Sequence, residues 1–145
     1  MKTTTEGTPM KQKQQTIQLA DERGQSLTEF ALALPILALL LFAIIQFGIV
    51  FNNYVTLTDA TRAGARKGAV ARRLPNPTQA CMRAVTDSAG GLSQKPGFSA
   101  SCTPSNNWQP GSDVTVRAQY PYQISLLGLV VKNGNLSSTT TERVE

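Results

Sequence analysis

Histidine is absent from the chain, and cysteine occurs only twice, at Cys81 and Cys102. Without histidine the chain lacks the commonest general base of enzymes and the commonest ligand of transition metals. Two thiolates cannot complete a four-ligand zinc site by themselves. The serines and carboxylates show no spacing typical of a nucleophile and its base. We therefore expect no catalytic site, no metal and no cofactor, and we do not expect an enzyme.

Positive charge exceeds negative charge, and the basic residues are partly clustered. Charged residues make up 16% of the 145 residues, and the net charge is +5. Five basic residues fall within twelve positions, namely Arg62, Arg66, Lys67, Arg72 and Arg73. Such a cluster can indicate nucleic-acid binding, but no glycine-rich phosphate loop, zinc spacing or aromatic RNA-binding motif accompanies it. Because it follows an apolar run, contact with lipid head groups or acidic partners is favoured, and we expect no nucleic acid.

That apolar run is residues 30–51, FALALPILALLLFAIIQFGIVF, which contain no charge. As a helix, its 22 residues would measure about 33 Å at ~1.5 Å per residue, enough to cross a hydrocarbon core of about 30 Å. A cleaved secretory signal is the alternative, but its apolar core has only about 7–15 residues. The nearest small-x-small pattern, residues 63–65, begins twelve positions after the run and is flanked by arginines. We therefore expect one transmembrane helix.

The two cysteines follow this span and leave two interpretations open. A disulfide between Cys81 and Cys102 is the simpler functional interpretation, and two reduced, buried thiols are the alternative. The choice depends on the side of the membrane that the cysteines face, because disulfides persist in oxidising compartments.

A polar motif leads directly into the span, where residues 23–35 read RGQSLTEFALALP. Glu29 abuts the apolar run, and burying a carboxylate there is costly unless it is paired. Ser26 and Glu29 also fit a helix capping box, with Ser26 as N-cap and Glu29 at the third helical position. Capping alone would account for both residues.

The string from Gly24 to Pro35, GQSLTEFALALP, resembles the start of TadE-like minor pseudopilins of tight-adherence pili, a type IV-pilin-like family. The resemblance continues through residues 46–48 (QFG) to residues 60–66 (ATRAGAR), so it covers roughly residues 23–66. Many relatives carry glutamate at the position of Gln46, and this chain lacks that charge.

The resemblance implies a processing site and an assembly contact. A prepilin peptidase would cut between Gly24 and Gln25, which makes Gln25 the new N-terminus. Glu29, next to Phe30, would then pair with the α-amine of a neighbouring subunit and set the axial register of packed helices. The implied partners are the prepilin peptidase, other pilins and pseudopilins, the inner-membrane pilus assembly platform and the membrane itself.

Basic residues on the two sides of the span nearly balance, so charge alone does not decide the orientation. The resemblance implies a bacterial cell-membrane protein with a cytoplasmic N-terminus and an extracytoplasmic C-terminal domain, and it leaves open whether the protein enters the extracellular pilus. We expect a leader at 1–24 without regular structure in residues 1–22, a transmembrane helix at 25–51, a helical extension at 52–73 and a small α+β domain at 74–145.

The helix is expected to continue to Arg73, because no proline occurs from residue 52 to 73 and Pro75 and Pro77 follow. Within the span, Pro35 would remove a backbone hydrogen bond, and Gln46 could hydrogen-bond a neighbouring helix.

Three small residues recur every fourth position on one face of the extension, namely Ala60, Gly64 and Gly68. Small residues allow close helix packing. Two partners remain open for this face: another subunit, or the chain's own sheet.

The rest of the chain predicts a small α+β domain. Residues 78–89 suggest a short helix that ends at Gly90-Gly91. Residues 98–102 and 114–122 alternate as strands do, and Trp108 is expected to anchor the loop between them. Residues 126–131 form either a strand or a hydrophobic patch near the membrane, and Asn133-Gly134 predicts a hairpin turn before a last strand at 136–144. The predicted fold class is α+β, with a long N-terminal transmembrane helix extending into a stalk, a short helix and an antiparallel sheet of three or four strands.

Three classes of function remain. The first is a minor pseudopilin, a structural or assembly component of a tight-adherence pilus. The second is an uncleaved single-pass envelope protein with a small binding domain. The third, a membrane-tethered enzyme, is disfavoured by the absence of histidine. The mature N-terminus separates the first two.

Overall fold

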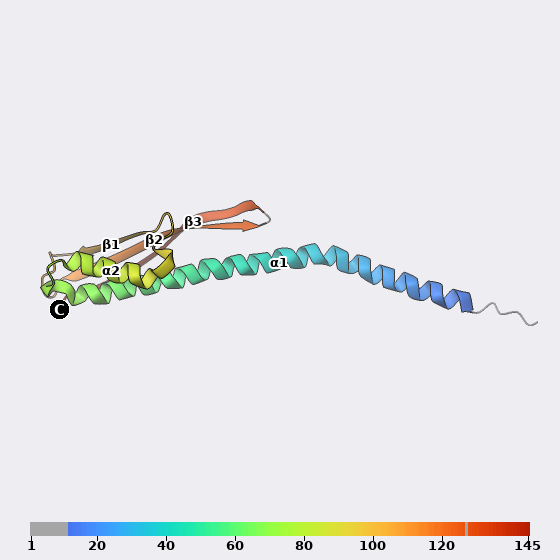
Figure 1. Cartoon of the computed structure of the whole chain (residues 1–145), viewed down its shortest axis with the longest axis horizontal. Coiled ribbons are helices and arrows are strands. Elements are labelled where there is room, and N and C mark those ends of the chain that lie inside the picture. The colour runs from blue at the N-terminus through green and yellow to red at the C-terminus, as the bar shows by residue number, and fades with distance from the viewer. Residues whose placement is uncertain (1–11, 127) are drawn as a thin grey trace, which may run out of the picture. The chain divides into compact units, whose positions relative to one another are not determined.

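The computed structural model describes residues 12–126 and 128–145, with side chains from residue 24 onward (Figure 1). The chain divides into two compact units, residues 1–42 and residues 43–145, which we describe separately. Helix α1, Gln12–Ala69, contributes to both.

In the first unit, all described residues belong to α1. We expected residues 1–22 to lack regular structure, and this is wrong for residues 12–22, which are helical; residues 1–11 lie outside the described residues. The sequence from residue 12 to 25, QKQQTIQLADERGQ, is rich in helix-forming residues and contains no proline. A single glycine costs a helix only about 1 kcal/mol, so Gly24 does not interrupt it.

The second unit contains the rest of α1 and all other elements. A 3-10 turn, η1 (Ala71–Arg73), leads to α2 (Pro77–Ala89), and η2 (Gly90–Leu92) precedes the sheet. The strands are β1 (Ser99–Pro104), β2 (Asp113–Leu126) and β3 (Leu129–Arg143), antiparallel in the order β1-β2-β3. The predicted α+β class is confirmed, with three strands among the described residues.

The start of α2 and the end of α1 each have an identifiable cause. Pro77 occupies the first turn of α2, and the Asn76 side chain accepts a hydrogen bond from the Gln79 N–H at 3.2 Å. Helix α1 ends at Ala69 rather than at the predicted Arg73. The Ala69 carbonyl accepts a hydrogen bond from the Glu145 N–H at 3.0 Å. A distant part of the chain therefore satisfies the end of α1, which local sequence could not indicate.

The core lies between the two helices and one face of the sheet. Val114, Val116 and Ala118 alternate along β2 and are fully buried. The core residues that meet them come from α1, α2, β1 and the loops, and include Leu57, Ala65, Val85, Ala89, Cys102 and Val144. The opposite sheet face carries exposed polar side chains such as Arg117. This is the two-layer arrangement that lets a small sheet bury one face.

Two sequence predictions about this core are confirmed. Cys81 on α2 and Cys102 on β1 form a disulfide, with a Cα–Cα distance of 6.4 Å. Trp108 is buried and anchors the loop between β1 and β2.

The predicted hairpin turn at Asn133-Gly134 is wrong. Both residues lie inside β3, where Gly134 pairs with Tyr122. The turn instead falls between Leu126 and Leu129, the last paired residues. The observed register pairs β2 with β3 along its whole length, from Asp113 to Leu126. Gly134 also lacks the side chain that would meet the Tyr122 ring, since a Cβ there would lie 2.9 Å from Tyr122 Cε1.

Candidate functional site: a membrane-boundary motif and an apolar helix

The residues predicted for processing and register lie on successive turns of α1 in the first unit. Gly24, Gln25, Glu29 and Phe30 are all exposed. The Thr28 hydroxyl donates to the carbonyl oxygens of Gly24, at 3.2 Å, and Gln25, at 2.7 Å. In the uncut chain, the bond between Gly24 and Gln25 is thus part of a continuous helix.

This continuity removes the capping-box interpretation for the uncut chain. A capping box stabilises the first turn of a helix, but α1 begins at Gln12 and Ser26 lies well inside it. The Glu29 carboxylate instead accepts a hydrogen bond from Gln25 Nε2 at 3.3 Å. No ion pair of Glu29 is found within residues 24–126 and 128–145. A carboxylate placed beside an apolar span without a cation is the kind of group that an intermolecular partner could satisfy.

The apolar part of α1 is exposed over the predicted span. Among the described residues, α1 alone has both the length and the apolar composition needed to cross a membrane. Large exposed apolar side chains lie on all sides of it, among them Leu34, Ile36, Leu37, Leu39, Leu41 and Phe42. Such a surface is suited to lipid rather than water. The helix is therefore compatible with membrane anchoring.

Two residues of the span were singled out from the sequence. Pro35 lies inside α1, which continues through it. Gln46 is half-buried and lines a groove with residues of the β2–β3 hairpin, including Tyr120 and Tyr122. The groove is formed within the second unit.

The small-residue face of α1 is covered by the chain's own domain. Ala60, Gly64 and Gly68 are buried. A Cβ at Gly64 would overlap a γ-methyl of Val85 on α2 and lie 3.3 Å from Val116 Cγ1 on β2. A Cβ at Gly68 would lie 3.3 Å from Val114 and 3.4 Å from Trp108. These residues let α1 approach α2 and the sheet closely, as packing against the chain's own sheet requires.

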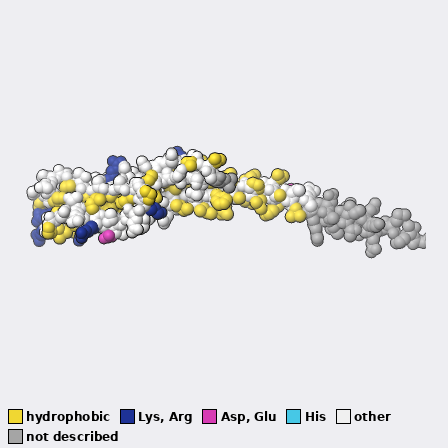
Figure 2. Space-filling view, turned by 45° about the horizontal axis from the view of Figure 1, so that its top comes forward, with side chains coloured by type: hydrophobic (Ala, Val, Ile, Leu, Met, Phe, Trp, Pro, Cys, Tyr) yellow, Lys and Arg dark blue, Asp and Glu magenta, His cyan; other side chains and the backbone are white. Residues whose placement is uncertain are grey.

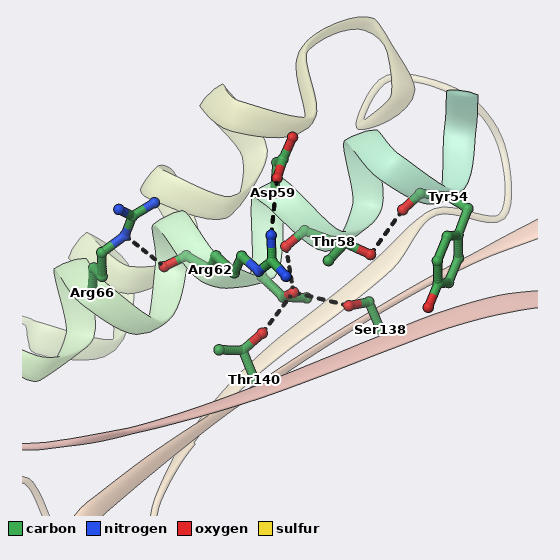
Figure 3. Close-up of polar contacts among 8 residues, drawn as sticks. Tyr54, Thr58, Asp59, Arg62, Arg66, Ser138 and Thr140 are labelled. Atoms are coloured by element: carbon green, nitrogen blue, oxygen red, sulfur yellow. Dashed lines mark hydrogen bonds and ion pairs between the residues drawn. The ribbon is translucent and has the colours of Figure 1, made fainter. Parts of the chain in front are cut away.

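A polar cluster in this interface was not predicted from the sequence. Thr61 on α1 is fully buried, and its hydroxyl lies 3.0 Å from the hydroxyl of Ser138 on β3 (Figure 3). Thr140 donates to the same Thr61 oxygen at 3.0 Å. The Thr61 hydroxyl donates to the Thr58 carbonyl at 2.9 Å. The threonine-rich composition of residues 136–144 was the available signal, but only the tertiary fold shows which hydroxyls point inward.

The basic cluster begins some distance beyond the end of the apolar run. Arg62 is eleven residues past Phe51 on the same helix, which is about 16 Å at ~1.5 Å per residue. Each polar head-group layer is only about 5–8 Å thick, so a helix perpendicular to the bilayer that leaves the hydrocarbon core at Phe51 would carry Arg62 beyond that layer. Arg62 instead lies 3.7 Å from Asp59, with both side chains exposed (Figure 3). In the space-filling view, Lys and Arg side chains gather at the domain, whereas hydrophobic side chains dominate α1 (Figure 2).

The described residues include no cluster of three or more histidine, cysteine or carboxylate side chains that could hold a metal ion. Both cysteines are used by the disulfide. The arrangement offers a long apolar surface, which is compatible with membrane anchoring, next to the boundary motif.

Comparison with known families agrees with this description. A family model described as TadE-like protein matches residues 24–66. No curated protein and no solved structure matches the chain. The TadE-like family is a structural family associated with Tad pili. The match begins at Gly24, includes the whole apolar run and ends at Arg66, in the part of α1 that packs against the domain. It confirms the resemblance found in the sequence over residues 24–66 and is consistent with a TadE-like, pilin-like protein.

Proposed function

We propose that the protein is a minor pseudopilin, a structural or assembly component of a tight-adherence pilus. The observation that carries this proposal is the position of the boundary motif. Gly24–Phe30 stands at the start of an exposed apolar helix, and that helix continues as the buried support of an α+β domain. The match to the TadE-like family begins at Gly24, the residue after which we place the cleavage.

In this proposal a prepilin peptidase removes residues 1–24 at the cytoplasmic face, and Gln25 becomes the N-terminus. Glu29 then pairs with the free α-amine of a neighbouring pilin or pseudopilin. Both groups lie at the edge of the hydrocarbon region, where an unpaired charge is costly. The pairing therefore favours one axial offset between helices, and Phe30 begins the lipid-facing surface beside it.

The same proposal sets the topology. The N-terminus faces the cytoplasm, and the disulfide-bonded domain lies outside, where a disulfide persists. The partners are the prepilin peptidase, other pilins and pseudopilins, and the inner-membrane assembly platform. The role is structural and not enzymatic.

One observation favours the alternative, an uncleaved envelope protein anchored by α1. The helix runs without interruption from Gln12 through Gly24, so the uncut form needs no rearrangement to be stable. A peptidase, by contrast, must open this helix locally to reach the Gly24–Gln25 bond.

The mature N-terminus decides between the two. The full chain is co-expressed with a prepilin peptidase, and its intact mass and N-terminal peptide are measured. We expect an N-terminus at Gln25. Gly24→Val should block cleavage, whereas Gly48→Val should be processed normally; a Cβ at either glycine meets nothing within 4 Å, so neither change disturbs packing. Retention of residue 1 in cells with an active peptidase would refute the pseudopilin proposal.

A further inference from the structure

The end of the β2–β3 hairpin is unusually apolar for a sheet that faces water. Residues 118–131 carry no charge. Leu129, Val130 and Val131 are 75%, 53% and 62% exposed. Three consecutive large apolar side chains on an exposed strand are not expected unless they serve a contact. We call Ile124, Leu126, Leu129, Val130 and Val131 the hairpin end.

The hairpin end lies beside the apolar run of α1. Ala43, Phe47 and Val50 of the helix line one groove of about 720 Å³ with residues of the hairpin, including Ile124, Leu126 and Val131. Phe47 precedes the last residue of the run, Phe51, by four positions, or about 6 Å at ~1.5 Å per residue. The hairpin extends along α1 beyond α2 (Figure 1). It therefore lies next to the last turns of the helix segment that is suited to lipid.

Polar groups mark the other limit of this surface. Lys132 lines the same groove, and Tyr122 lies between the hairpin end and the body of the sheet. Lysine and tyrosine are the residues that favour a membrane–water interface, because each combines an apolar body with a polar tip. The order along the hairpin is thus apolar end, interfacial residues and then polar sheet.

Backbone hydrogen bonding limits how deeply the hairpin end can insert into a bilayer. A two-stranded hairpin has two open edges, and open edges do not occur in the hydrocarbon core. A depth of about 5–10 Å, at the boundary between head groups and acyl chains, allows the edges to meet polar groups while the side chains meet lipid. This depth agrees with the position of Phe47 near the end of the apolar run.

We propose that the hairpin end inserts into the interfacial layer of the leaflet on the domain's side. The domain then contacts the bilayer at two points, through α1 and through the hairpin, which restricts its tilt and its rotation about α1. We expect lipid to contact the hairpin end, because the hairpin end lies beside Ala43, Phe47 and Val50 and extends the apolar surface of α1 there. The inference rests on the membrane anchorage of the proposed function, and it needs neither the peptidase nor a pilus.

Depth-dependent quenching tests this proposal. The full chain with Leu129→Cys is labelled with an environment-sensitive fluorophore and reconstituted in phosphatidylethanolamine–phosphatidylglycerol vesicles. Nitroxide groups are placed near the head group or deep in the acyl chains. Leu40→Cys, in the middle of the span, is the control for a membrane-embedded site. Thr139→Cys, exposed on β3 within the domain, is the control for a site in water. Val130→Cys serves as a second hairpin site if the first variant folds poorly.

We expect shallow nitroxides to quench the Leu129 probe several-fold more than the Thr139 probe, and deep nitroxides to quench the Leu40 probe most. If Leu40 is quenched but Leu129 behaves like Thr139, the hairpin proposal is overturned while the anchorage stands. If the Leu40 probe is not quenched either, both the membrane anchorage and the proposed function are refuted. Cross-linking of Leu129→Cys to a second copy, without lipid quenching, would assign the surface to a protein contact and also overturn the proposal.

Discussion

Replacing Gly64 by alanine adds one methyl group at the point where α1, α2 and β2 meet. The added carbon would overlap a γ-methyl of Val85 and lie 3.3 Å from Val116 Cγ1 and 3.5 Å from the Cys81 carbonyl oxygen. Val85 and Val116 are fully buried. The methyl group therefore cannot be accommodated without moving α1 or the Val85 side chain.

Two opposing terms set the expected size of the effect. Overpacking of a buried site costs about 1–3 kcal/mol. Alanine is preferred over glycine in a helix by about 1 kcal/mol, which offsets part of this cost. The overlap with Val85 places the overpacking cost in the upper half of that range, so we expect Gly64→Ala to lower the free energy of unfolding by about 1–2 kcal/mol. For a domain of about 100 residues, each kcal/mol corresponds to a loss of about 4–8 °C in Tm.

Thermal unfolding of the full chain in detergent measures this effect. Trp108 is the single tryptophan, is buried and packs next to Gly68, so its fluorescence reports on the same interface. Gly48→Ala is the matched control on the same helix, because a Cβ there meets nothing within 4 Å. It should leave the Tm unchanged or slightly higher.

A double-mutant cycle with Val85→Ala identifies the contact. Alone, Val85→Ala removes two buried carbon atoms and should cost roughly 1.5–3 kcal/mol. In the Gly64→Ala background it should cost less, because it also relieves the overlap, with a coupling energy above about 0.5 kcal/mol. Strictly additive effects, or a Gly64→Ala protein as stable as the wild type, would show that α1 does not pack here as described.

Three further predictions concern the disulfide, the threonine cluster and the boundary carboxylate. Reduction of the disulfide, which links residues 21 apart, should lower the free energy of unfolding by about 3 kcal/mol in the chain-entropy model; an unchanged Tm under reducing conditions would contradict this. Thr61→Val leaves the buried Ser138 hydroxyl without its 3.0 Å partner and should cost about 1–3 kcal/mol. Thr58→Val, at a half-buried position where the hydroxyl donates to the Tyr54 carbonyl of the same helix, should change the free energy of unfolding by no more than about 0.5 kcal/mol. Equal effects of the two substitutions would reject the cluster as a stabilising feature. Glu29→Gln should leave processing intact and reduce pilus assembly, measured by co-purification of partner pilins, whereas Ser26→Ala should leave assembly near normal; equal losses would mean that the carboxylate acts only locally on the helix.

Several features follow from local chemistry and were accessible from the sequence. A run of 22 uncharged residues predicts a helix long and apolar enough to cross a membrane, and that run is helical and exposed. Asn76, Pro77 and Gly90 begin and end α2 because capping depends on the residue at the helix end. The alternation of buried and exposed residues along β2 reflects the two-residue period of a strand. The boundary motif at Gly24–Phe30 was likewise recognised from the sequence, through its resemblance to the start of TadE-like proteins.

Other features depended on which distant segments meet. The turn preference of Asn133-Gly134 is local, and pairing along the whole of β2 outweighed it. The Ala69 carbonyl at the end of α1 accepts a hydrogen bond from the Glu145 N–H, 76 positions later (145 minus 69). The sequence showed that Ala60, Gly64 and Gly68 share a helix face. Only the folded domain, with Val85, Val114 and Val116 against that face, decided what covers it. Periodicity is a property of one segment, whereas burial is a property of two, so the sequence determined the faces and the tertiary structure determined their partners.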